Sequence, residues 1–381
     1  MNVQKICIIG DGLAGLMTAV TLSKQNVSID LYSSSQKKSK NLDNRTTAIS
    51  ESNFQYIKSN LNLNKDKFFW SCKKIKLFFE DNKKIINFMN FDEKNKSLMY
   101  IFQNKDLKNK LDRAISQKKN INLIKKNIKD VNSNDGFVMY DNKKKFYDLI
   151  ILSIGGQSKF YSKIEVGRTI KKNYKEIAIT AIIKHNAKIE NASQFFLKEG
   201  PLAVLPFKRN TFSSVWSISS NYFEAHKKNL KNILTAKLRE LLNNKNIEKI
   251  VHIQSFPINL NLKTKYYKKN ILILGDGLHT VHPLAGQGFN LVLRDIKKLN
   301  QLIFKKLRLG MLIKDSDLLK DFYNTRKPEN TLFGVGINFT NLFFKNNKYF
   351  SVLKKGILNN ISNFDIIKKV SQSVADRGIS L

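Results

Sequence analysis

The fold is decided by residues 274–295, which read LGDGLHTVHPLAGQGFNLVLRD. They follow the apolar run Ile271 to Ile273, which is typical of a buried strand. A carboxylate just past a strand, here Asp276, can hold sugar or ribitol hydroxyls. The Gly286-Gln287-Gly288 turn exposes backbone N–H groups at the start of a helix, where the helix dipole favours negative charge. These features are those of a ligand-binding turn between a strand and a helix.

Two other interpretations of this segment stay open. Asp276, His279 and His282 have a spacing that could ligate a metal ion. Alternatively, the segment is a plain loop whose histidines are satisfied within the core. Because a turn broken by Gly and Pro cannot align the three side chains on a helix, no metal ligand is assigned.

A second glycine-rich turn lies near the start of the chain. Residues 10–15, GDGLAG, form a GxGxxG pattern between the apolar strand Ile6 to Ile9 and a helix. Glycines allow the backbone to approach a pyrophosphate, and the helix N-terminus supplies donors and positive potential. In this context the hexapeptide predicts dinucleotide binding, with a structural turn as the alternative. The acid expected about twenty residues later is replaced by Ser33, which can hydrogen bond a ribose but carries no charge.

The charge balance raises the question of a polyanionic partner. The chain carries 67 Lys and Arg against 30 Asp and Glu, a formal net charge of +37. Nine of these cations are Arg, although phosphate and base recognition favour the forked Arg side chain. The lysines are scattered, and no nucleic-acid-binding motif is present. We therefore predict no nucleic-acid partner, and an anionic membrane surface is favoured instead.

Cysteine content and hydropathy indicate the compartment. Two cysteines, Cys7 and Cys72, cannot make a disulfide framework, which favours a reducing environment. The first apolar run is too short for a secretory signal, and nowhere do 18 consecutive apolar residues occur. The sequence therefore predicts a cytoplasmic protein.

Periodicity predicts an α/β chain with an inserted sheet. A strand, helix and strand are expected over residues 5–33, and a helix over 46–61. A hairpin is expected from runs 137–140 and 146–152. The middle, 176–257, alternates like an antiparallel sheet interrupted by one helix, and a long helical region ends the chain. We predict a discontinuous domain of residues 1–72, 100–160 and 265–330, an inserted domain of 73–99 and 161–264, and a C-terminal helical region of 331–381.

Several motifs carry a resemblance to a known family. GxGxxG followed much later by GD…H…HPLAGQGFN…LRD resembles the class A flavoprotein monooxygenases with the p-hydroxybenzoate hydroxylase fold, and more narrowly the UbiH-like hydroxylases of ubiquinone biosynthesis. Four further segments are similar to motifs of that branch: DNRTTAIS (43–50), GPLAVLP (200–206), FPI (256–258) and YNTRK (323–327). The resemblance implies a Rossmann-like FAD-binding domain, an antiparallel-sheet substrate domain and a helical C-terminal region.

The resemblance also implies which residues bind FAD. These are Gly10, Gly12, Leu13, Ala14, Gly15, Ser33, Arg45, Asp276, Pro283, Gly286, Gln287, Gly288, Phe289 and Asn290. No catalytic side chain is implied, because the flavin carries the chemistry. One motif departs from the family pattern: its middle A-D-G-x-x-S reads SIGGQS here, so Ile154 replaces the carboxylate.

The function implied is hydroxylation of a polyprenylated phenol in ubiquinone biosynthesis by FAD, NAD(P)H and O2, through a flavin C4a-hydroperoxide. Expected partners are that substrate, other quinone-biosynthesis proteins and the inner face of a membrane, to which residues 332–344 and nearby lysines could bind. Packing of this region on the flavin domain is the other reading. Two further functions stay open. The departures at Ser33 and Ile154 motivate a non-catalytic or weakly flavinylated scaffold subunit of a quinone-biosynthesis complex. The other is a flavin monooxygenase of a soluble aromatic.

Overall fold

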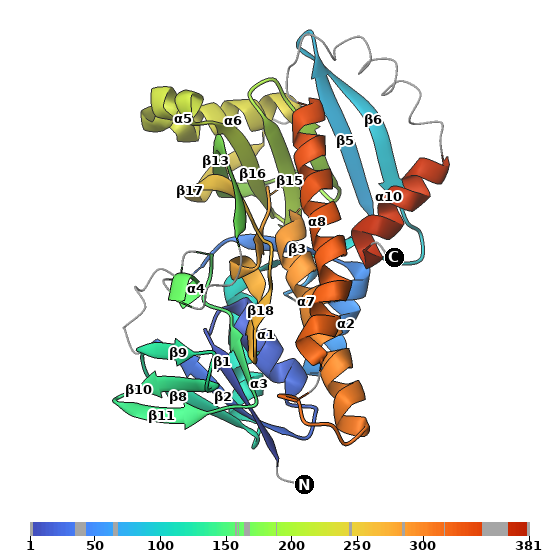
Figure 1. Cartoon of the computed structure of the whole chain (residues 1–381). Coiled ribbons are helices and arrows are strands. Elements are labelled where there is room, and N and C mark those ends of the chain that lie inside the picture. Colours follow the sequence, from blue (N-terminus) through green and yellow to red (C-terminus); the bar gives the residue numbers. More distant parts are fainter. Residues whose placement is uncertain are drawn as a thin grey trace.

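The computed structural model describes most of the chain. The described residues are 3–34, 43–63, 68–156, 158, 160–163, 168–187, 189–243, 246–283, 286–315, 317–344 and 365–378. Figure 1 shows two stacked parts, a mostly parallel sheet flanked by helices below and a larger sheet above, antiparallel except where β14 pairs with β5. One long helix, α8 (Leu318–Phe344), runs along both.

The lower sheet has six strands in the order β18-β19-β12-β1-β2-β8. Their bounds are β1 Gln4–Ile9, β2 Val27–Ser33, β8 Ile121–Lys125, β12 Leu149–Leu152, β18 Tyr267–Lys268 and β19 Ile271–Ile273. All pairs are parallel except β18 with β19. The central strands are apolar on both faces, because helices cover them. The predicted strand-helix-strand unit and the buried strand before Gly275 are confirmed.

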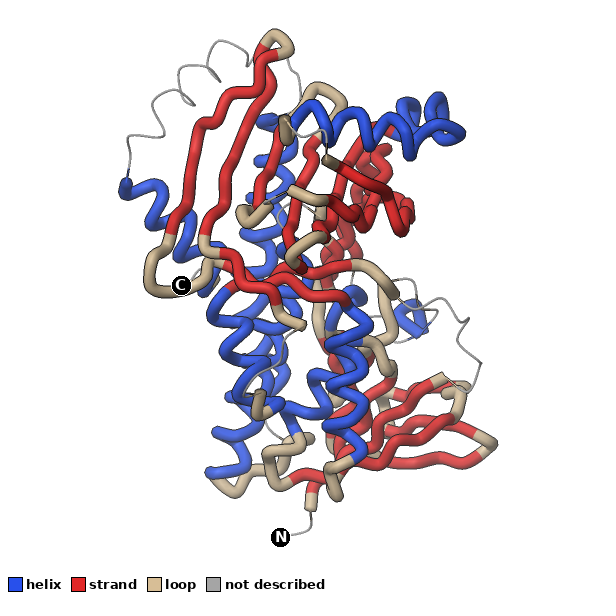
Figure 2. Tube along the Cα trace, turned by 180° about the vertical axis from the view of Figure 1, so that it is seen from behind, coloured by secondary structure: helices blue, strands red, loops and turns tan. Residues whose placement is uncertain are grey.

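Helices pack on this sheet and give it its core. Their bounds are α1 Leu13–Leu22, α2 Glu51–Leu61, α3 Asn104–Ser116 and α7 Gln287–Arg308. Helix α1 is buried along nearly its whole length and lies against α3 and α7, and α7 packs against α8. Figure 2 shows these helices gathered beside the parallel sheet in the lower half of the molecule.

The upper sheet has eight strands in the order β20-β17-β13-β16-β15-β14-β5-β6. Their bounds are β5 Lys74–Asp81, β6 Lys84–Asp92, β13 Thr169–His185, β14 Ala192–Phe196, β15 Pro201–Lys208, β16 Thr211–Ser219, β17 Ile247–Lys263 and β20 His279–Thr280. Helices α5 (Ser220–His226) and α6 (Leu230–Leu241) follow β16, with the short 3-10 turn η1 (Lys227–Asn229) between them. The predicted antiparallel middle and its single interrupting helical region are confirmed.

Two small sheets complete the fold and correct two predictions. One has the order β3-β7-β4 (Thr46–Ser50, Met99–Gln103, Trp70–Cys72), so the first five residues of the helix predicted over 46–61 form a strand. The other has the order β11-β10-β9 (Lys143–Phe146, Phe137–Tyr140, Asp130–Asn132). The hairpin therefore returns through the lysine-rich segment, and the more apolar run 149–152 is buried in the parallel sheet instead.

The predicted fold class, a Rossmann-like α/β chain with an antiparallel sheet and a helical C-terminal region, is confirmed. The exact domain bounds stay a prediction. Helix α8 continues through residue 330, where one bound was placed. The last described helix, α10 (Asp365–Arg377), lies beside β6 and α2 (Figure 1).

Candidate functional site

The site is built where three neighbouring parallel strands end. Strands β1, β12 and β19 are adjacent, and their ends lie level. The residue after β12, Ser153, donates its N–H to the last residue of β1, Ile9 O, at 2.8 Å, and Leu274 after β19 donates to Leu152 O at 3.0 Å. The glycine turns after Ile9 and Leu274 therefore lie at one edge of the sheet. In α/β folds this carboxyl edge is where ligands bind.

The three glycines of the turn at residues 10–15 have three different environments. Gly10 has φ +115°, and a Cβ on it would stand 2.3 Å from Ser153 O. A Cβ on Gly15 would stand 1.9 Å from Gly10 O, so helix α1 packs directly on the turn. A Cβ on Gly12 would meet nothing within 4 Å. A tight turn, an open approach and a close helix contact are the geometry that a dinucleotide pyrophosphate needs.

The other predicted residues of the first half lie around this turn. Leu13 and Ala14 begin α1, and Ala14 Cβ would be 3.0 Å from a Cβ on Gly275, so the two turns touch. Ser33 ends β2 at the same edge, is buried, and lies in register with Lys125 of β8. The sequence thus has a serine where a carboxylate was expected, and the lysine Lys125 lies beside it on the neighbouring strand.

Arg45 and Asp276 lie near each other. The guanidinium of Arg45 donates from Nε and Nη2 to Asp43, each at 2.8 Å. The hydrogen bond and charge of Asp43, together with the charge of Asp276, raise the pKa of Arg45. Asp276 is exposed within the 3-10 turn η2 (Gly275–Gly277). A hydroxylated chain lying across the strand ends can therefore meet both a cation and a carboxylate.

Helix α7 begins in the turn formed by Gly286, Gln287 and Gly288. Its N-cap Gly286 adopts the left-handed conformation with φ 65°, and a Cβ on Gly288 would meet nothing within 4 Å. The first turn of α7 carries no acidic residue, so the helix dipole is not offset there. Gln287 Oε1 is buried and has no hydrogen-bond partner among the described residues. An open, positively polarised helix start with a free acceptor suits a planar group that has both acceptors and N–H donors.

The other predicted residues of this turn have structural contacts. Pro283 is half-buried and its carbonyl accepts from Gly286 N at 3.3 Å, while Phe289 packs on the main core. Asn290 is buried, and its side chain binds Ser50 N (2.9 Å), Asn53 (2.8 Å) and the carbonyls of Ala48 (3.1 Å) and Gly286 (3.2 Å). Asn290 therefore positions the turn against β3 and α2.

Ile154 lies in the loop after β12, next to both turns. Its side chain is half-buried against the core of the parallel sheet. The next residue, Gly155, has φ +80° and its carbonyl accepts from Tyr161 of α4 (Phe160–Lys163) at 2.7 Å. The apolar contact explains why an aliphatic side chain is stable at this position.

We expect Ile154→Asp to lower the free energy of unfolding by about 1 to 3 kcal/mol, because a carboxylate loses hydration in this half-buried apolar environment. Thermal melting and FAD titration measure the two effects separately. Ile154→Val, which keeps the apolar contact, is the matched control. A variant as stable as the wild type that binds FAD more tightly would show that the position faces the ligand.

Sequence reasoning missed the partners of both histidines in the second motif. His279 Nε2 lies 2.6 Å from Asp295 on α7, whose other oxygen accepts from Arg326 Nε of α8 at 2.6 Å. Arg326 also binds Glu329 and Asn330. His282 Nε2 lies 2.9 Å from Glu176 of β13. Both histidines are buried. Asp295 lies in the quoted LRD motif but was not recognised as a histidine partner, and Glu176 lies in no motif.

These pairings bear on the metal reading. His279 and His282 bind different carboxylates on different elements, and Asp276 lies exposed on the turn. Within the described part of the chain, no group of three or more His, Cys, Asp or Glu side chains could hold a metal ion. The histidines act here as satisfied core residues at their Nε2 atoms.

The C-terminal helix α10 ends against the same region. Asp376 accepts from Ser52 N through Oδ1 at 2.8 Å, and its carbonyl accepts from Ser50 Oγ at 3.0 Å. Arg294 of α7 donates to Ala375 O at 2.7 Å. The end of α10 therefore braces the junction of β3, α2 and α7 that Asn290 also holds.

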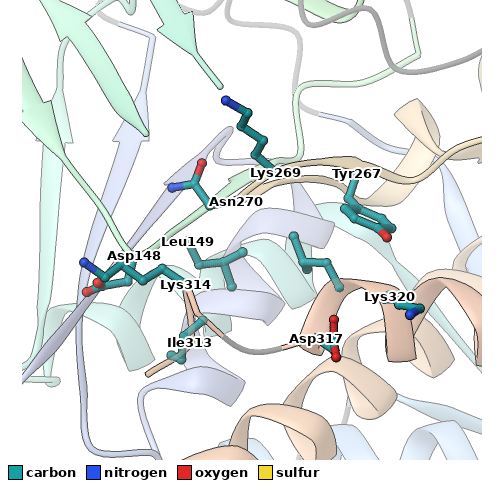
Figure 3. A pocket seen from close by; sticks show the side chains of 10 residues that line it. Asp148, Leu149, Tyr267, Lys269, Asn270, Ile313, Lys314, Asp317 and Lys320 are labelled. Atoms are coloured by element: carbon teal, nitrogen blue, oxygen red, sulfur yellow. The ribbon is translucent and has the colours of Figure 1, made fainter. Parts of the chain in front are cut away.

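The hollow in Figure 3 is a separate feature. Its lining includes Leu149 at the start of β12 and Asn270 just before β19, with Ile313 and Lys314 from the segment before α8. The glycine turns follow the ends of those same strands. The hollow thus lies at the opposite edge of the parallel sheet from the candidate site.

Comparisons with known proteins agree with this geometry. A family model described as squalene epoxidase matches residues 215–372. The mitochondrial ubiquinone biosynthesis monooxygenase COQ6 of Dictyostelium discoideum is 26% identical over 95% of this chain and 89% of that protein. The 3-demethoxyubiquinol 3-hydroxylase of Escherichia coli is 28% identical, over 40% of each chain. One relative thus matches nearly end to end, and the other over less than half of its length.

Solved structures share the fold at low identity. The p-nitrophenol 4-monooxygenase PnpA of Pseudomonas putida superposes with a TM-score of 0.78 at 13% identity, covering 99% of both chains. PqsL of Pseudomonas aeruginosa in complex with 2-aminobenzoylacetate gives 0.74 at 16% identity, covering 88% of this chain and 95% of that one. The predicted resemblance is therefore confirmed: the chain is similar over nearly its whole length to a monooxygenase of ubiquinone biosynthesis, and it shares the fold of FAD-dependent monooxygenases.

Proposed function

We propose that the protein hydroxylates the ring of a polyprenylated phenol in ubiquinone biosynthesis, using FAD, NAD(P)H and O2. The observation that carries this proposal is the meeting of two glycine turns at the ends of β1, β12 and β19, with the open start of α7 beside them. The relatives named for ubiquinone hydroxylation supply the substrate class.

The residues present fit FAD. Gly12 leaves room for the pyrophosphate, and Gly10 and Gly15 shape the turn around it. We assign the remaining contacts to Leu13, Ala14, Ser33, Arg45, Asp276, Pro283, Gly286, Gln287, Gly288 and Phe289, with Asn290 holding the α7 turn in place. Bound FAD supplies the reductive activation of O2 that ring hydroxylation requires.

The chain itself contributes binding and electrostatics. Helix α7 is 22 residues long, and the dipole at its N-terminus stabilises negative charge at the Gly286–Gly288 turn. Gln287 Oε1 offers a buried acceptor to an N–H donor there. No side chain needs to form a covalent bond with the substrate.

Asp276→Ala is expected to weaken FAD binding, because each charge-assisted hydrogen bond to a hydroxyl contributes on the order of 1.5 to 3 kcal/mol. Asp276 is exposed, so the variant should fold normally. Titration of the apo-protein with FAD, followed by flavin fluorescence, measures the affinity. Equal affinity in wild type and variant would remove Asp276 from the site.

The proposed substrate site lies between the turn and the upper sheet. The candidate lining is β15, whose Leu202 to Phe207 are buried, together with Phe256 and Pro283. Phe256 of β17 lies 5.9 Å from the Arg45 guanidinium, which places it beside the proposed FAD site. An apolar wall next to the flavin is suited to a phenol with a hydrocarbon tail.

The decisive experiment compares a prenylated phenol with the same phenol lacking its tail. Each methylene removed from water contributes about 0.8 kcal/mol, so tail length should change affinity steeply. Product mass spectrometry and NAD(P)H oxidation measure turnover. Equal turnover of both phenols favours a soluble-aromatic hydroxylase. A flavin-loaded protein that hydroxylates neither favours the scaffold function.

Ser33 and Ile154 are the observations behind that second candidate, a weakly flavinylated scaffold subunit of a quinone-biosynthesis complex. The visible spectrum of the purified protein distinguishes the two. Flavin near one equivalent per chain supports the enzyme, whereas a protein that does not take up added FAD supports the scaffold.

Membrane contact is proposed for the upper part of α8. Phe333 and Ile337 pack inward, whereas Leu332, Val335 and Phe339 are 45%, 55% and 66% exposed along one stripe. One face of α8 thus suits packing on the rest of the protein, and the other suits contact with a membrane.

Phe344 and the lysines at 345, 348, 354 and 355 lie outside the residues whose side chains are described. None of the described helices has a stretch long and apolar enough to cross a membrane. We propose peripheral binding to an anionic inner membrane face, testable by salt-sensitive liposome sedimentation.

A further inference from the structure

A buried polar cluster lies between the upper sheet and the segment that leads into the Gly286–Gly288 turn. It consists of Tyr174 and Glu176 of β13 and His282, which directly precedes Pro283. Their exposed fractions are 7%, 5% and 0%. The rings of Tyr174 and His282 meet edge to face, with centroids 5.4 Å apart. His282 belongs to the HPLAGQGFN motif but not to the residues assigned to FAD, and Tyr174 and Glu176 lie outside all the motifs.

A backbone irregularity directs these side chains inward. The pairing of β13 with β17 shifts register between Asn173 and Glu176, and Lys175 between them has φ +53°. Asn173 supports this bulge by accepting from Lys175 N at 2.8 Å. Bulges re-aim side chains and occur beside active sites.

The pairing with Glu176 fixes what His282 can bind. Because a carboxylate accepts, the proton of the neutral imidazole lies on Nε2, and Nδ1 is left as an acceptor. His282 Nδ1 and Tyr174 Oη are both buried and have no hydrogen-bond partner among the described residues. Burial raises the pKa of Tyr174 to about 12, with a further contribution from Glu176, so its hydroxyl stays protonated. Two buried polar atoms without partners, on rings that meet edge to face, offer one acceptor and one donor to a hydroxyl group.

The surroundings of this polar site are apolar except for Lys172, whose Nζ lies 5.2 Å from the centroid of the Tyr174 ring. Tyr174 packs in an apolar cluster that also contains Val281, Leu291, Phe333 and Phe256. Phe256 also lies beside Arg45. A ligand here must place one hydroxyl among hydrocarbon groups. His279 has a similar carboxylate partner, but that partner lies on α7 and is shared with Arg326 of α8, so it joins helices instead of facing the sheet.

We propose that His282 and Tyr174 bind the phenolic hydroxyl of the substrate ring, with Glu176 as the positioning residue that fixes the His282 tautomer. The phenol donates its O–H to His282 Nδ1, and Tyr174 Oη donates to the phenol oxygen. This inference rests on the proposed function, because it specifies how the substrate is held at the same site. It explains why a base-like side chain precedes the proline of the turn.

The test compares a prenylated phenol with its methyl ether, which cannot donate. Binding to the FAD-loaded protein is followed by the change in flavin absorbance, without turnover. We expect the wild type to bind the phenol at least about tenfold more tightly, because a site built for a hydroxyl rejects an analogue without it. His282→Gln, which keeps a donor for Glu176 but lacks Nδ1, should lose most of this preference.

Two further variants separate binding from structure. Tyr174→Phe removes an unpaired buried hydroxyl, so it should keep or raise the melting temperature while reducing the preference. Glu176→Gln keeps an acceptor for Nε2–H and should retain the preference, whereas Glu176→Leu should lose it. His185→Gln is the matched control, since His185 is a fully buried histidine beside Phe212, away from the site.

The outcomes are distinct. A preference that disappears in His282→Gln and Tyr174→Phe but persists in His185→Gln supports the inference. Equal binding of phenol and ether by a wild type that still hydroxylates the phenol overturns the inference and leaves the proposed function standing. Unchanged preference in both site variants also overturns it. Failure of the FAD-loaded wild type to bind or hydroxylate either compound counts against both.

Discussion

Replacing Asp295 by Ala is expected to destabilise the protein by about 3 to 5 kcal/mol, the cost of breaking a buried ion pair by removing one of its members. Asp295 is 0% exposed and binds His279 and Arg326, which are themselves buried. Its loss would leave the Arg326 guanidinium with Glu329 as its remaining carboxylate partner among the described residues. Denaturant unfolding measures the change.

Asp112→Ala is the matched control for this prediction. Asp112 pairs with Lys108 at 2.8 Å on the surface of α3 and is 48% exposed. Such an i,i+4 pair contributes only about 0.3 to 0.5 kcal/mol. Similar destabilisation by the two substitutions would contradict a special role for the buried network.

Acid should weaken the same network. Burial alone would raise the pKa of Asp295, but the nearby charges of Arg326 and His279 and their hydrogen bonds hold it below its ordinary value. A depressed carboxyl pKa stabilises the fold at neutral pH, and this contribution is lost as pH falls below about 4, the unfolded value. The difference in unfolding free energy between wild type and Asp295→Ala should therefore shrink between pH 7 and pH 3.

The second large effect is expected at the first glycine turn, where two substitutions of the same kind should behave differently. Gly15→Ala places a methyl 1.9 Å from the carbonyl of Gly10, so α1 must move off the turn. Overpacking of this kind costs about 1 to 3 kcal/mol, and the displaced turn should no longer retain FAD.

Gly12→Ala should instead leave stability nearly unchanged. Its backbone is extended, with φ −74° and ψ 175°, and the added methyl meets nothing within 4 Å. The methyl would stand where the pyrophosphate approaches, so we expect FAD affinity to fall by at least about tenfold. Melting of the apo-protein and FAD titration give the two quantities. Normal FAD affinity in Gly12→Ala would show that the ligand does not approach the turn from that side.

Local patterns predicted the parallel-sheet unit and both glycine turns correctly, because their signals are short-range. A buried strand that ends in Gly-x-Gly leaves few alternatives for the backbone. The same local reasoning failed at residues 46–50 and 143–146, where polar and lysine-rich strands form edges or small sheets. Residues 46–50 pair with the distant strand β7, which neither composition nor periodicity records. Residues 143–146 pair with the adjacent strand β10, so the error there was in where the hairpin returns.

The sequence by itself determined the α/β fold, the two turns and, through its motifs, the resemblance to flavin monooxygenases. The tertiary structure alone decided that Asn290 holds the turn internally, that Ile154 packs on the core, and that His279 and His282 meet Asp295 and Glu176. Glu176 and His282 are 106 positions apart, and a bulge in β13 aims one at the other. Buried polar pairs of this kind depend on which elements pack together, because the low-dielectric interior makes a distant partner as necessary as a near one.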